Sequence, residues 1–222
     1  MKPETGALPP EFAVLEPALA QGIEAMGLRL TESQRHALLA YLALLARWGR
    51  AYNLTAVLEP REMVARHLLD SLSLLPWLRG ERVVDSGTGA GLPGVPLAIA
   101  CPERQFVLID GNGKKIRFLR QVRRELGLSN IEPIQARLEN PPDIPPPDCI
   151  TARALAPLAQ LVEWHRDWLD QGATLLAMKS RDVENELSGL TGAYNVDIID
   201  LNVPGEHARR CLAIVTRIVT RP

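Results

Sequence analysis

The sequence has few of the residues that carry metal, disulfide or stacking chemistry. Its three cysteines, Cys101, Cys149 and Cys211, form no Cys-x-x-Cys pair, so neither a zinc site nor a disulfide framework is indicated, and buried thiols in a reducing compartment are expected. Aromatic residues make up only 5% of the chain, which disfavours a binding surface paved with stacking rings. No apolar run approaches the roughly 18 residues of a membrane span, and the first residues lack the apolar core of a signal peptide. We therefore expect a soluble, cytoplasmic protein without a metal or a membrane partner.

The sequence also lacks a net charge that would indicate a partner. The 25 basic and 26 acidic residues give a formal charge of -1, and the 46% hydrophobic content is ordinary for a globular chain of 222 residues. This neutrality is an average over two opposed parts. Residues 47–124 carry 13 basic and 7 acidic residues, whereas the remainder carries 12 and 19. The basic part could dock on an RNA backbone.

The first 79 residues are predicted to form a helical extension that packs on a larger domain. Thr31 and Gln34 form a capping-box pattern, and apolar residues follow at helical spacing up to Trp48. A second helix is predicted from about residue 61 to 75. Arg66 and Asp70 are expected to pair on the outer face of this helix, four residues apart.

Residues 80–222 are predicted to form an α/β domain. Strands are expected at about 82–85, 105–110, 131–135, 148–152 and 173–178, with helices at about 95–100, 114–126 and 155–169 between them. Residues 194–203 and 211–219 alternate like an antiparallel pair of strands, whereas the proline-rich segment 141–147 can only be a loop. This order predicts a mostly parallel sheet with helices on both faces, finished by a C-terminal antiparallel hairpin.

A glycine-rich loop follows the first predicted strand. Residues 85–94 read Asp-Ser-Gly-Thr-Gly-Ala-Gly-Leu-Pro-Gly, and this position is where doubly wound folds bind ligands. Residues 89–94 match the dinucleotide pattern G-x-G-x-x-G, with Asp110 ending the next strand. The carboxylate of Asp85 would repel a pyrophosphate but suits the cationic end of S-adenosylmethionine, and Asp110 could accept hydrogen bonds from ribose hydroxyls in either case. No tyrosine has a lysine four residues later, so S-adenosylmethionine is favoured over a nicotinamide cofactor or a turn without a ligand.

The chain resembles the bacterial small-subunit ribosomal RNA methyltransferase G family, also called glucose-inhibited division protein B, over roughly residues 28–220. The resemblance is carried by Trp48, by Ala-Tyr-Asn-Leu-Thr at 51–55, by Arg-His-x-Leu-Asp-Ser at 66–71, by Gly-Thr-Gly-Ala-Gly-Leu-Pro-Gly-Val-Pro-Leu at 87–97, by Gly-Lys-Lys-x-Arg-Phe-Leu-Arg-Gln-Val at 113–122 and by Ala-Arg-Ala at 152–154. Ser86 departs from the family's usual Asp-Val, placing a hydroxyl where the family has an apolar residue.

The resemblance implies a class I methyltransferase with a Rossmann-like, seven-stranded sheet. It also implies methylation of N7 of one specific guanine in 16S ribosomal RNA, with the RNA, the small subunit or an assembly intermediate as substrate. We expect a monomer. A non-catalytic RNA- or ribosome-binding protein on the same fold is the alternative. The expected contacts to S-adenosylmethionine, from the loop pattern and the resemblance together, are Asp85, Gly87, Gly89, Gly91, Leu92, Asp110, Leu138, Glu139 and Arg153.

Methylation of guanine N7 needs no deprotonation, because N7 carries a free lone pair. Alignment of the reactants can supply much of the rate enhancement, so neither an obligatory general base nor a covalent nucleophile is expected. His67 and Lys179 are the candidates for residues near the reacting atoms. The tetrad at residues 140–143, Asn-Pro-Pro-Asp, is a poor match to the Asn-Pro-Pro-aromatic motif of amine methyltransferases, and no cysteine is placed for carbon methylation.

RNA binding is expected from basic residues along the helix that begins near residue 114. Six basic residues and no acid lie between Lys114 and Arg124. The alternative, a solvated helix face, is common. Lys115 falls within the apolar arc at the helix start, where it could reach the ligand or an RNA phosphate. The candidate RNA-binding residues are Arg66, Lys114, Lys115, Arg117, Arg120 and Arg124.

Overall fold

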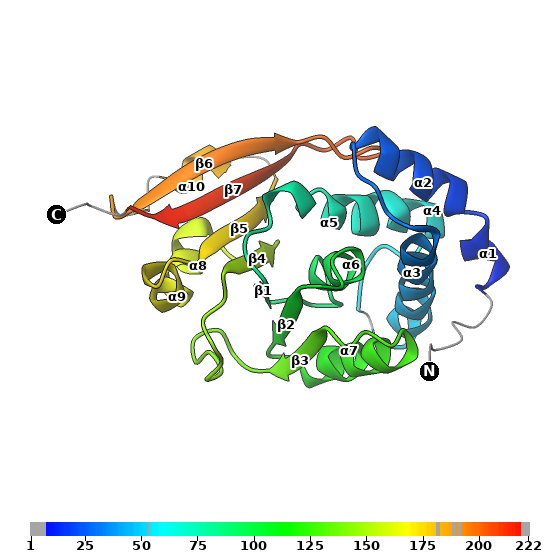
Figure 1. The fold of residues 1–222 in the computed structure, drawn as a ribbon, viewed down its shortest axis with the longest axis horizontal. Coiled ribbons are helices and arrows are strands. Elements are labelled where there is room, and N and C mark those ends of the chain that lie inside the picture. Colours follow the sequence, from blue (N-terminus) through cyan, green and yellow to red (C-terminus); the bar gives the residue numbers. More distant parts are fainter. Residues whose placement is uncertain (1–7, 53, 181–182, 188–189, 191, 219–222) are drawn as a thin grey trace.

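A seven-stranded sheet forms the centre of the protein, as seen in a computed structural model that describes residues 8–52, 54–180, 183–187, 190 and 192–218. The strand order is β3-β2-β1-β4-β5-β7-β6, and β7 runs antiparallel to its neighbours β5 and β6 (Figure 1). This confirms the predicted parallel sheet with a C-terminal hairpin. The strands are Arg82–Ser86 (β1), Gln105–Asp110 (β2), Ile131–Gln135 (β3), Cys149–Arg153 (β4), Thr174–Lys179 (β5), Tyr194–Leu201 (β6) and Arg210–Arg217 (β7).

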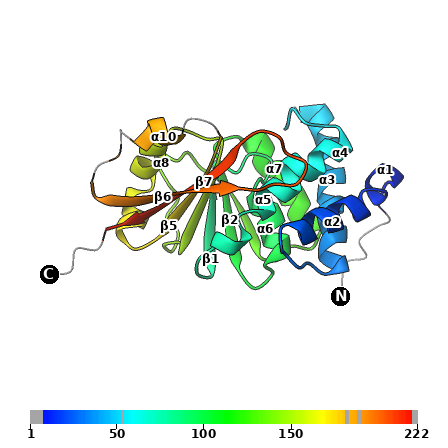
Figure 2. The same ribbon diagram turned by 90° about the horizontal axis from the view of Figure 1, so that it is seen from above.

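Helices cover both faces of this sheet, as Figure 2 shows. The helices are Pro10–Ala13 (α1), Glu16–Ala25 (α2), Glu32–Tyr52 (α3), Pro60–Met63 (α4), the π-helix Val64–Leu69 (η1), Asp70–Leu72 (α5), the 3-10 helix Leu75–Trp77 (η2), Gly94–Ala100 (α6), Gly113–Glu125 (α7), Leu158–Trp164 (α8), Arg166–Asp170 (α9) and Val183–Glu186 (α10). The alternation of side chains along each strand divides the core: Val83 belongs to a cluster with α3, α6 and α7, and Val84 to a cluster with α8 and α9.

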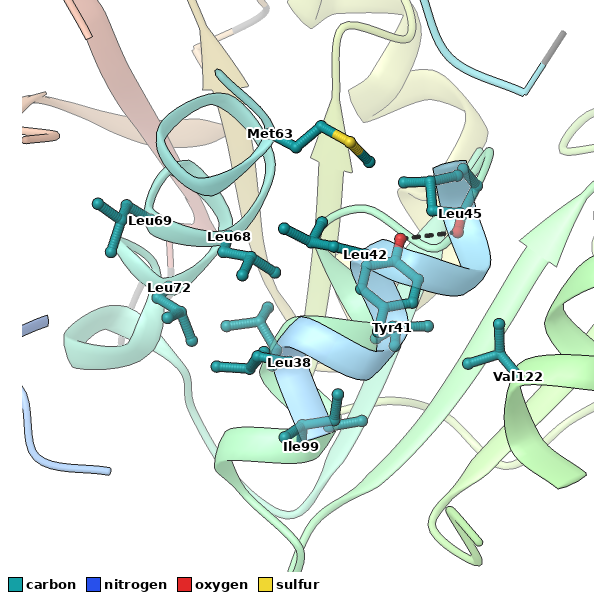
Figure 3. Close-up of a cluster of buried hydrophobic side chains, with 14 of the residues drawn as sticks. Leu38, Tyr41, Leu42, Leu45, Met63, Leu68, Leu69, Leu72, Ile99 and Val122 are labelled. Carbon is teal, nitrogen blue, oxygen red and sulfur yellow. Dashed lines mark hydrogen bonds between the residues drawn. The ribbon is translucent and has the colours of Figure 1, made fainter. Parts of the chain in front are cut away.

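The N-terminal helices share their core with the sheet domain. Leucines of α3 pack against η1, α5 and α6, and Leu38, Leu42, Leu68 and Leu72 meet in one buried cluster (Figure 3). The capping box is confirmed, because the Thr31 N–H donates to Gln34 Oε1 at 2.9 Å and the Gln34 N–H donates to Thr31 Oγ1 at 3.2 Å. The Gln34 side-chain amide continues to the last carbonyls of α6. The division of the chain into a helical extension at 1–79, packed on the core, and a methyltransferase domain at 80–222 stays a prediction.

Three helical regions differ from the sequence-based expectation. The single helix predicted from residue 61 to 75 is divided into α4, η1, α5 and η2. The helix predicted over 155–169 begins three residues later, because Ala154 takes a left-handed φ of 47° and Pro157 precedes the first turn, and it breaks at His165. No individual helix was predicted at the positions of α1 and α2.

Candidate functional site

The glycine loop joins β1 to α6 at the point where the strand order reverses. Gly87, Gly89 and Gly91 have φ of 63°, 62° and 99°, a region that L side chains rarely adopt. Space is also limiting: a Cβ on Gly87 would lie 2.4 Å from the side chain of Leu155. The loop is fastened to β2, because the Thr88 N–H donates to the Ile109 carbonyl at 2.9 Å. These glycines therefore shape one wall of a crevice at the carboxyl edge of the sheet.

Asp85 stabilises this loop from within the protein. Its side chain is fully buried, and it accepts hydrogen bonds from Thr88 Oγ1, from Thr151 Oγ1 at 2.9 Å and from the Gly94 N–H at 2.9 Å. Burial raises the pKa of Asp85 to about 6, although these donors act in the opposite direction. Both carboxylate oxygens of Asp85 therefore hold the loop and the neighbouring strand, and a contact from Asp85 to the ligand stays a prediction.

A buried tyrosine supports the same loop from α3. The Tyr41 hydroxyl donates to the Ala90 carbonyl at 2.9 Å, and burial raises the Tyr41 pKa, so the phenol stays protonated (Figure 3). The helical stripe of the sequence indicates that Tyr41 lies in the core, but no local signal shows that its hydroxyl reaches the loop 49 residues later.

Asp110 closes the other side of the loop. Its Oδ2 accepts from the Gly89 N–H at 3.0 Å, and its Oδ1 accepts from the Asn112 N–H at 2.8 Å. Lys115 Nζ lies 3.4 Å from Oδ2, so the lysine predicted beside the crevice pairs with this carboxylate. Asn112 also caps α7 through its side chain, a role typical of an asparagine at this position.

A first cavity of about 450 Å³ opens beside these residues, and we call it the β2–β3 cavity. It brings together five predicted site residues: Gly87, Asp110, Lys115, Leu138 and Glu139. Six lining residues were not predicted: Gly111, Asn112, Ala136, Arg137, Leu155 and Trp164. The predicted residues Gly89, Gly91, Leu92 and Arg153 are not among those that line it. Leu92 instead packs against the hydrophobic core.

A second cavity, of about 500 Å³, lies at the carboxyl ends of β4 and β5, and we call it the β4–β5 cavity. It contains Arg153 and Lys179 from the prediction, and Leu155 lines both cavities. Three charged residues that line it were not predicted as site residues. These are Asp70, Glu186 and Arg210.

Asp70 organises the arginines of the β4–β5 cavity. It is 1% exposed, and its two oxygens lie 3.1 Å from Arg153 Nη1 and 3.1 Å from Arg210 Nε. Arg153 Nη2 also donates to the Arg66 carbonyl at 3.0 Å. Burial raises the pKa of Asp70, although both arginines oppose this. The array brings η1, β4 and β7 together at the cavity wall.

The predicted pairing of Arg66 with Asp70 is wrong. Arg66 contacts carboxylates at 3.7 Å in Glu62 and at 3.9 Å in Glu206, whereas Asp70 points inward to Arg153. The reason is the π-helical turn of η1, which rotates the following residues relative to an α-helix and buries Asp70.

Two buried histidines support the two cavities from behind. His67 lies against Thr55, with 3.0 Å between Nε2 and Oγ1, and burial together with Arg153 lowers its pKa to about 4. The ring lines neither cavity, although the charge of Arg153 reaches it. His165 Nε2 lies 2.9 Å from Ser86 Oγ, and burial lowers the His165 pKa to about 4. This contact satisfies the hydroxyl that departs from the family pattern.

The predicted basic face on α7 is exposed. Lys114, Arg117, Arg120 and Arg124 lie outward, while Phe118, Leu119 and Val122 are buried. Arg124 bonds Gln121, and Arg47 of α3 pairs with Glu125 at 2.9 Å at the end of the same helix. The structure thus presents a cationic face beside the β2–β3 cavity, which contains Lys115 at the start of α7.

The other chemistry considered from the sequence finds no support in the described residues. Cys149 and Cys211 are buried, Cys101 is partly exposed, and the Asn-Pro-Pro-Asp tetrad follows β3 rather than β4. In the described ranges no group of His, Cys, Asp and Glu could hold a metal ion. Nor is any helix within those ranges long and apolar enough to cross a membrane.

The sheet order and the cavities at its carboxyl edge define a class I methyltransferase fold. Solved structures with this fold include cofactor-bound Rv0187 from MTB, with a TM-score of 0.58 and 19% identity over 82% of this chain and 89% of that one. An S-adenosylmethionine-dependent O-methyltransferase from Thermotoga maritima is similar, with a TM-score of 0.53 and 12% identity over 80% and 73%.

Sequence comparison identifies the family. Residues 34–214 match the model for rRNA small subunit methyltransferase G. The chain is 43% identical over 198 residues to Ribosomal RNA small subunit methyltransferase G of Klebsiella pneumoniae, covering 89% of this chain and 96% of the relative. It is 44% identical to the Escherichia coli K12 protein of that name, covering 85% of this chain and 92% of the relative. The chain belongs to the rRNA small subunit methyltransferase G family.

Proposed function

We propose that this protein transfers a methyl group from S-adenosylmethionine to N7 of a guanine in 16S ribosomal RNA. The observation that carries the proposal is the pair of adjoining cavities at the carboxyl edge of a class I methyltransferase sheet, in a chain of the rRNA small subunit methyltransferase G family. One cavity suits a nucleoside and the other a planar base that gains a positive charge on methylation. We also propose that the protein works as a monomer in the cytoplasm, where its substrate is the RNA, the small subunit or an assembly intermediate.

The residues of the β2–β3 cavity fit S-adenosylmethionine. Gly87 lets the Leu155 side chain pack against the loop at the cavity wall, because a Cβ there would lie 2.4 Å from it, and Asp110 ends β2 where ribose hydroxyls could donate to it. Leu138 and Glu139 lie where their backbone could bind an adenine edge. Arg153, in the neighbouring cavity, could reach the carboxylate of the methionine part. Gly89, Gly91 and Leu92 would then shape the loop rather than touch the ligand.

The bound cofactor supplies an electrophilic methyl group on a sulfonium. The protein must hold guanine N7 in line with that group, and such alignment can contribute roughly 7–11 kcal/mol. No residue needs to remove a proton from N7. Leu155 lines both cavities and excludes water from the space between them, because it packs over Gly87. Carboxylates in the β4–β5 cavity can stabilise the positive charge that develops on the base.

The cationic face of α7 is proposed to bind the RNA backbone. Lys114, Arg117, Arg120 and Arg124 are exposed on one helix that begins at the β2–β3 cavity. Arg66 at the edge of η1 could add a contact near the β4–β5 cavity. Lys115 pairs with Asp110, so we assign it to the cofactor side rather than to RNA phosphate.

The test is methyl transfer to small subunits that lack the modification. The protein is incubated with S-adenosylmethionine and with subunits from a strain without its own enzyme of this family, and the RNA is mapped by mass. Appearance of one N7-methylguanine supports the proposal. If calorimetry shows no binding of S-adenosylmethionine at millimolar concentration, the protein is instead a non-catalytic RNA- or ribosome-binding relative.

A further inference from the structure

The β4–β5 cavity contains a charged pair that the methyl donor does not require. Lys179 ends β5, and its Nζ lies 2.6 Å from Glu186 Oε2 of α10. The lysine side chain is 11% exposed and the glutamate side chain 30% exposed, and both line the cavity. A second donation, from Lys179 Nζ to the Ala156 carbonyl at 2.7 Å, fixes the ammonium beside the segment that separates the two cavities.

The Lys179–Glu186 pair lies where the base that accepts the methyl group would have to bind. A methyl group can only pass between reactants in contact, so the base must lie next to the donor, and Leu155 is the lining residue common to both cavities. The backbone is strained at this boundary, because Ala154 has a left-handed φ of 47°. Such strain is often found where a ligand site requires it. The β4–β5 cavity therefore lies where a base drawn out of the RNA could enter.

Lys179 and Glu186 offer a hydrogen-bond donor and acceptor side by side. Guanine presents the complementary order on its Watson–Crick edge, with the O6 acceptor next to the N1–H donor and the N2 amine beyond. Adenine presents the reverse order, with an amine donor at C6 and an acceptor at N1. Enzymes that act on extruded bases read this edge within a pocket. A base held by this pair would therefore be selected as guanine over adenine through a repulsive as well as an attractive contact.

We propose that the β4–β5 cavity binds the target guanine, with Lys179 donating to O6 and Glu186 accepting from N1–H and the N2 amine. This inference rests on the proposed function and adds the residues that select the base. Recognition on the Watson–Crick edge leaves N7, which lies on the Hoogsteen edge of the base, open to the donor. The Glu186 carboxylate also stabilises the cationic methylated base.

A purely structural role for Glu186 makes a different prediction. Its Oε2 also accepts from the Leu158 N–H at 2.6 Å, and so it stabilises the start of α8. If that were its only role, Glu186→Gln would change stability but would not change the response to atoms on the guanine. Base analogues therefore separate the two roles.

The experiment measures kcat and KM for reconstituted small subunits that carry guanine or inosine at the target, since inosine lacks only the N2 amine. The wild-type protein is expected to lose about 10-fold or more in kcat/KM with inosine. Glu186→Gln is expected to lose about 10- to 100-fold with guanine but to show less than about a 3-fold further loss with inosine. Lys179→Met should lower kcat/KM similarly, and Lys179→Arg should restore part of it.

Control variants and a binding measurement separate a failure of base recognition by Glu186 from a failure of the proposed function. Glu184→Gln changes an exposed carboxylate on the same helix α10, which pairs with Arg209, and it should keep both wild-type activity and the inosine penalty. S-adenosylmethionine affinity, by calorimetry, should change less than about 2-fold in Glu186→Gln. A wild-type protein that methylates inosine and guanine equally overturns the inference, even if the variants fail to fold. A full inosine penalty in Glu186→Gln also overturns it, whereas absence of any methylation by the wild type overturns the proposed function itself.

Discussion

The two cavities are built in contrasting ways. The β2–β3 cavity is formed by glycines, backbone donors and residues from two short stretches, 87–115 and 136–139, with Leu155 and Trp164 added. The β4–β5 cavity is formed by charged side chains from separate elements, and the two partners Asp70 and Arg210 are 140 residues apart. A local sequence motif is sufficient to specify the first. The second exists only once the whole sheet has assembled, so its chemistry depends on tertiary packing.

The largest effect is expected at the wall between the cavities. Gly87→Arg should lower methyl transfer by more than about 100-fold and abolish S-adenosylmethionine binding, because even a Cβ there would lie 2.4 Å from Leu155. Thermal unfolding should stay cooperative. The matched control is Gly192→Ala, where a Cβ meets nothing within 4 Å. Unimpaired activity of Gly87→Arg would remove the loop from the site.

The β4–β5 cavity can be disturbed alone through its central carboxylate. Asp70→Asn removes the charge that pairs with Arg153 and Arg210, while Arg210 keeps its pair with Glu206, and the loss of charge-assisted contacts should lower kcat/KM by about 10- to 100-fold. Asp170→Asn breaks an exposed pair with Arg217 and should leave activity unchanged. Equal activity of the two variants would show that the arginine array is not part of the site.

RNA affinity should depend on the face beside the first cavity. Reversal of charge at Arg117, Arg120 and Arg124 should weaken RNA binding about 10-fold or more and lower the slope of log K against log salt by about 2 to 3. Reversal at Arg166, which pairs with Glu163 on the exposed surface of α9, is the control. A salt slope unchanged from that of the wild type would mean that the α7 face is merely solvated.

Each of the two regions contains one buried imidazole whose pKa should make the free energy of unfolding depend on pH. Burial lowers the pKa of His165 and of His67 to about 4, so between pH 6.5 and 4 the unfolded chain binds more protons and the free energy of unfolding falls on acidification. Each imidazole contributes up to about 1.4 kcal/mol per pH unit. Asp85, with its pKa raised to about 6, acts in the opposite sense between about pH 4 and 6, because there the folded chain binds more protons.

A double substitution isolates the imidazole behind the β2–β3 cavity. Ser86→Val with His165→Phe replaces the buried polar pair by apolar groups, while His67 remains as the internal reference. In urea unfolding at pH 7, 6 and 5, the free energy of unfolding of the variant should rise relative to that of the wild type by about 1 kcal/mol for each pH unit of acidification. Parallel curves would indicate that His165 binds protons equally in the folded and unfolded states, so that burial does not lower its pKa.

The sequence specified the local parts of the molecule well. The strands β1 to β5 lie within about a residue of their expected bounds. One cavity is lined by four residues that were predicted as parts of one site, Gly87, Asp110, Leu138 and Glu139. Alternating apolar runs and a glycine loop are short-range signals, which is why they can be recognised without a structure. The cofactor contacts themselves stay a prediction.

Long-range contacts were beyond the reach of sequence patterns. Asp70 was expected to pair along its own helix, but the π-helical turn directs it to Arg153 and Arg210. The hydrogen bond that Asp85 accepts from Thr151 of the neighbouring strand also had no signal in the sequence. Glu186 lies in a four-residue helix with no periodic signal, so nothing in the chain indicated its pairing with Lys179.

The central claim is that donor and base occupy the two adjoining cavities. A crystal structure with S-adenosylhomocysteine and a small-subunit RNA fragment containing the target guanine tests it most directly. The nucleoside is expected at Asp110 in the β2–β3 cavity, with the guanine between Lys179 and Glu186 and N7 toward the sulfur. A guanine bound elsewhere, or one whose Watson–Crick edge lies away from Lys179 and Glu186, would contradict it.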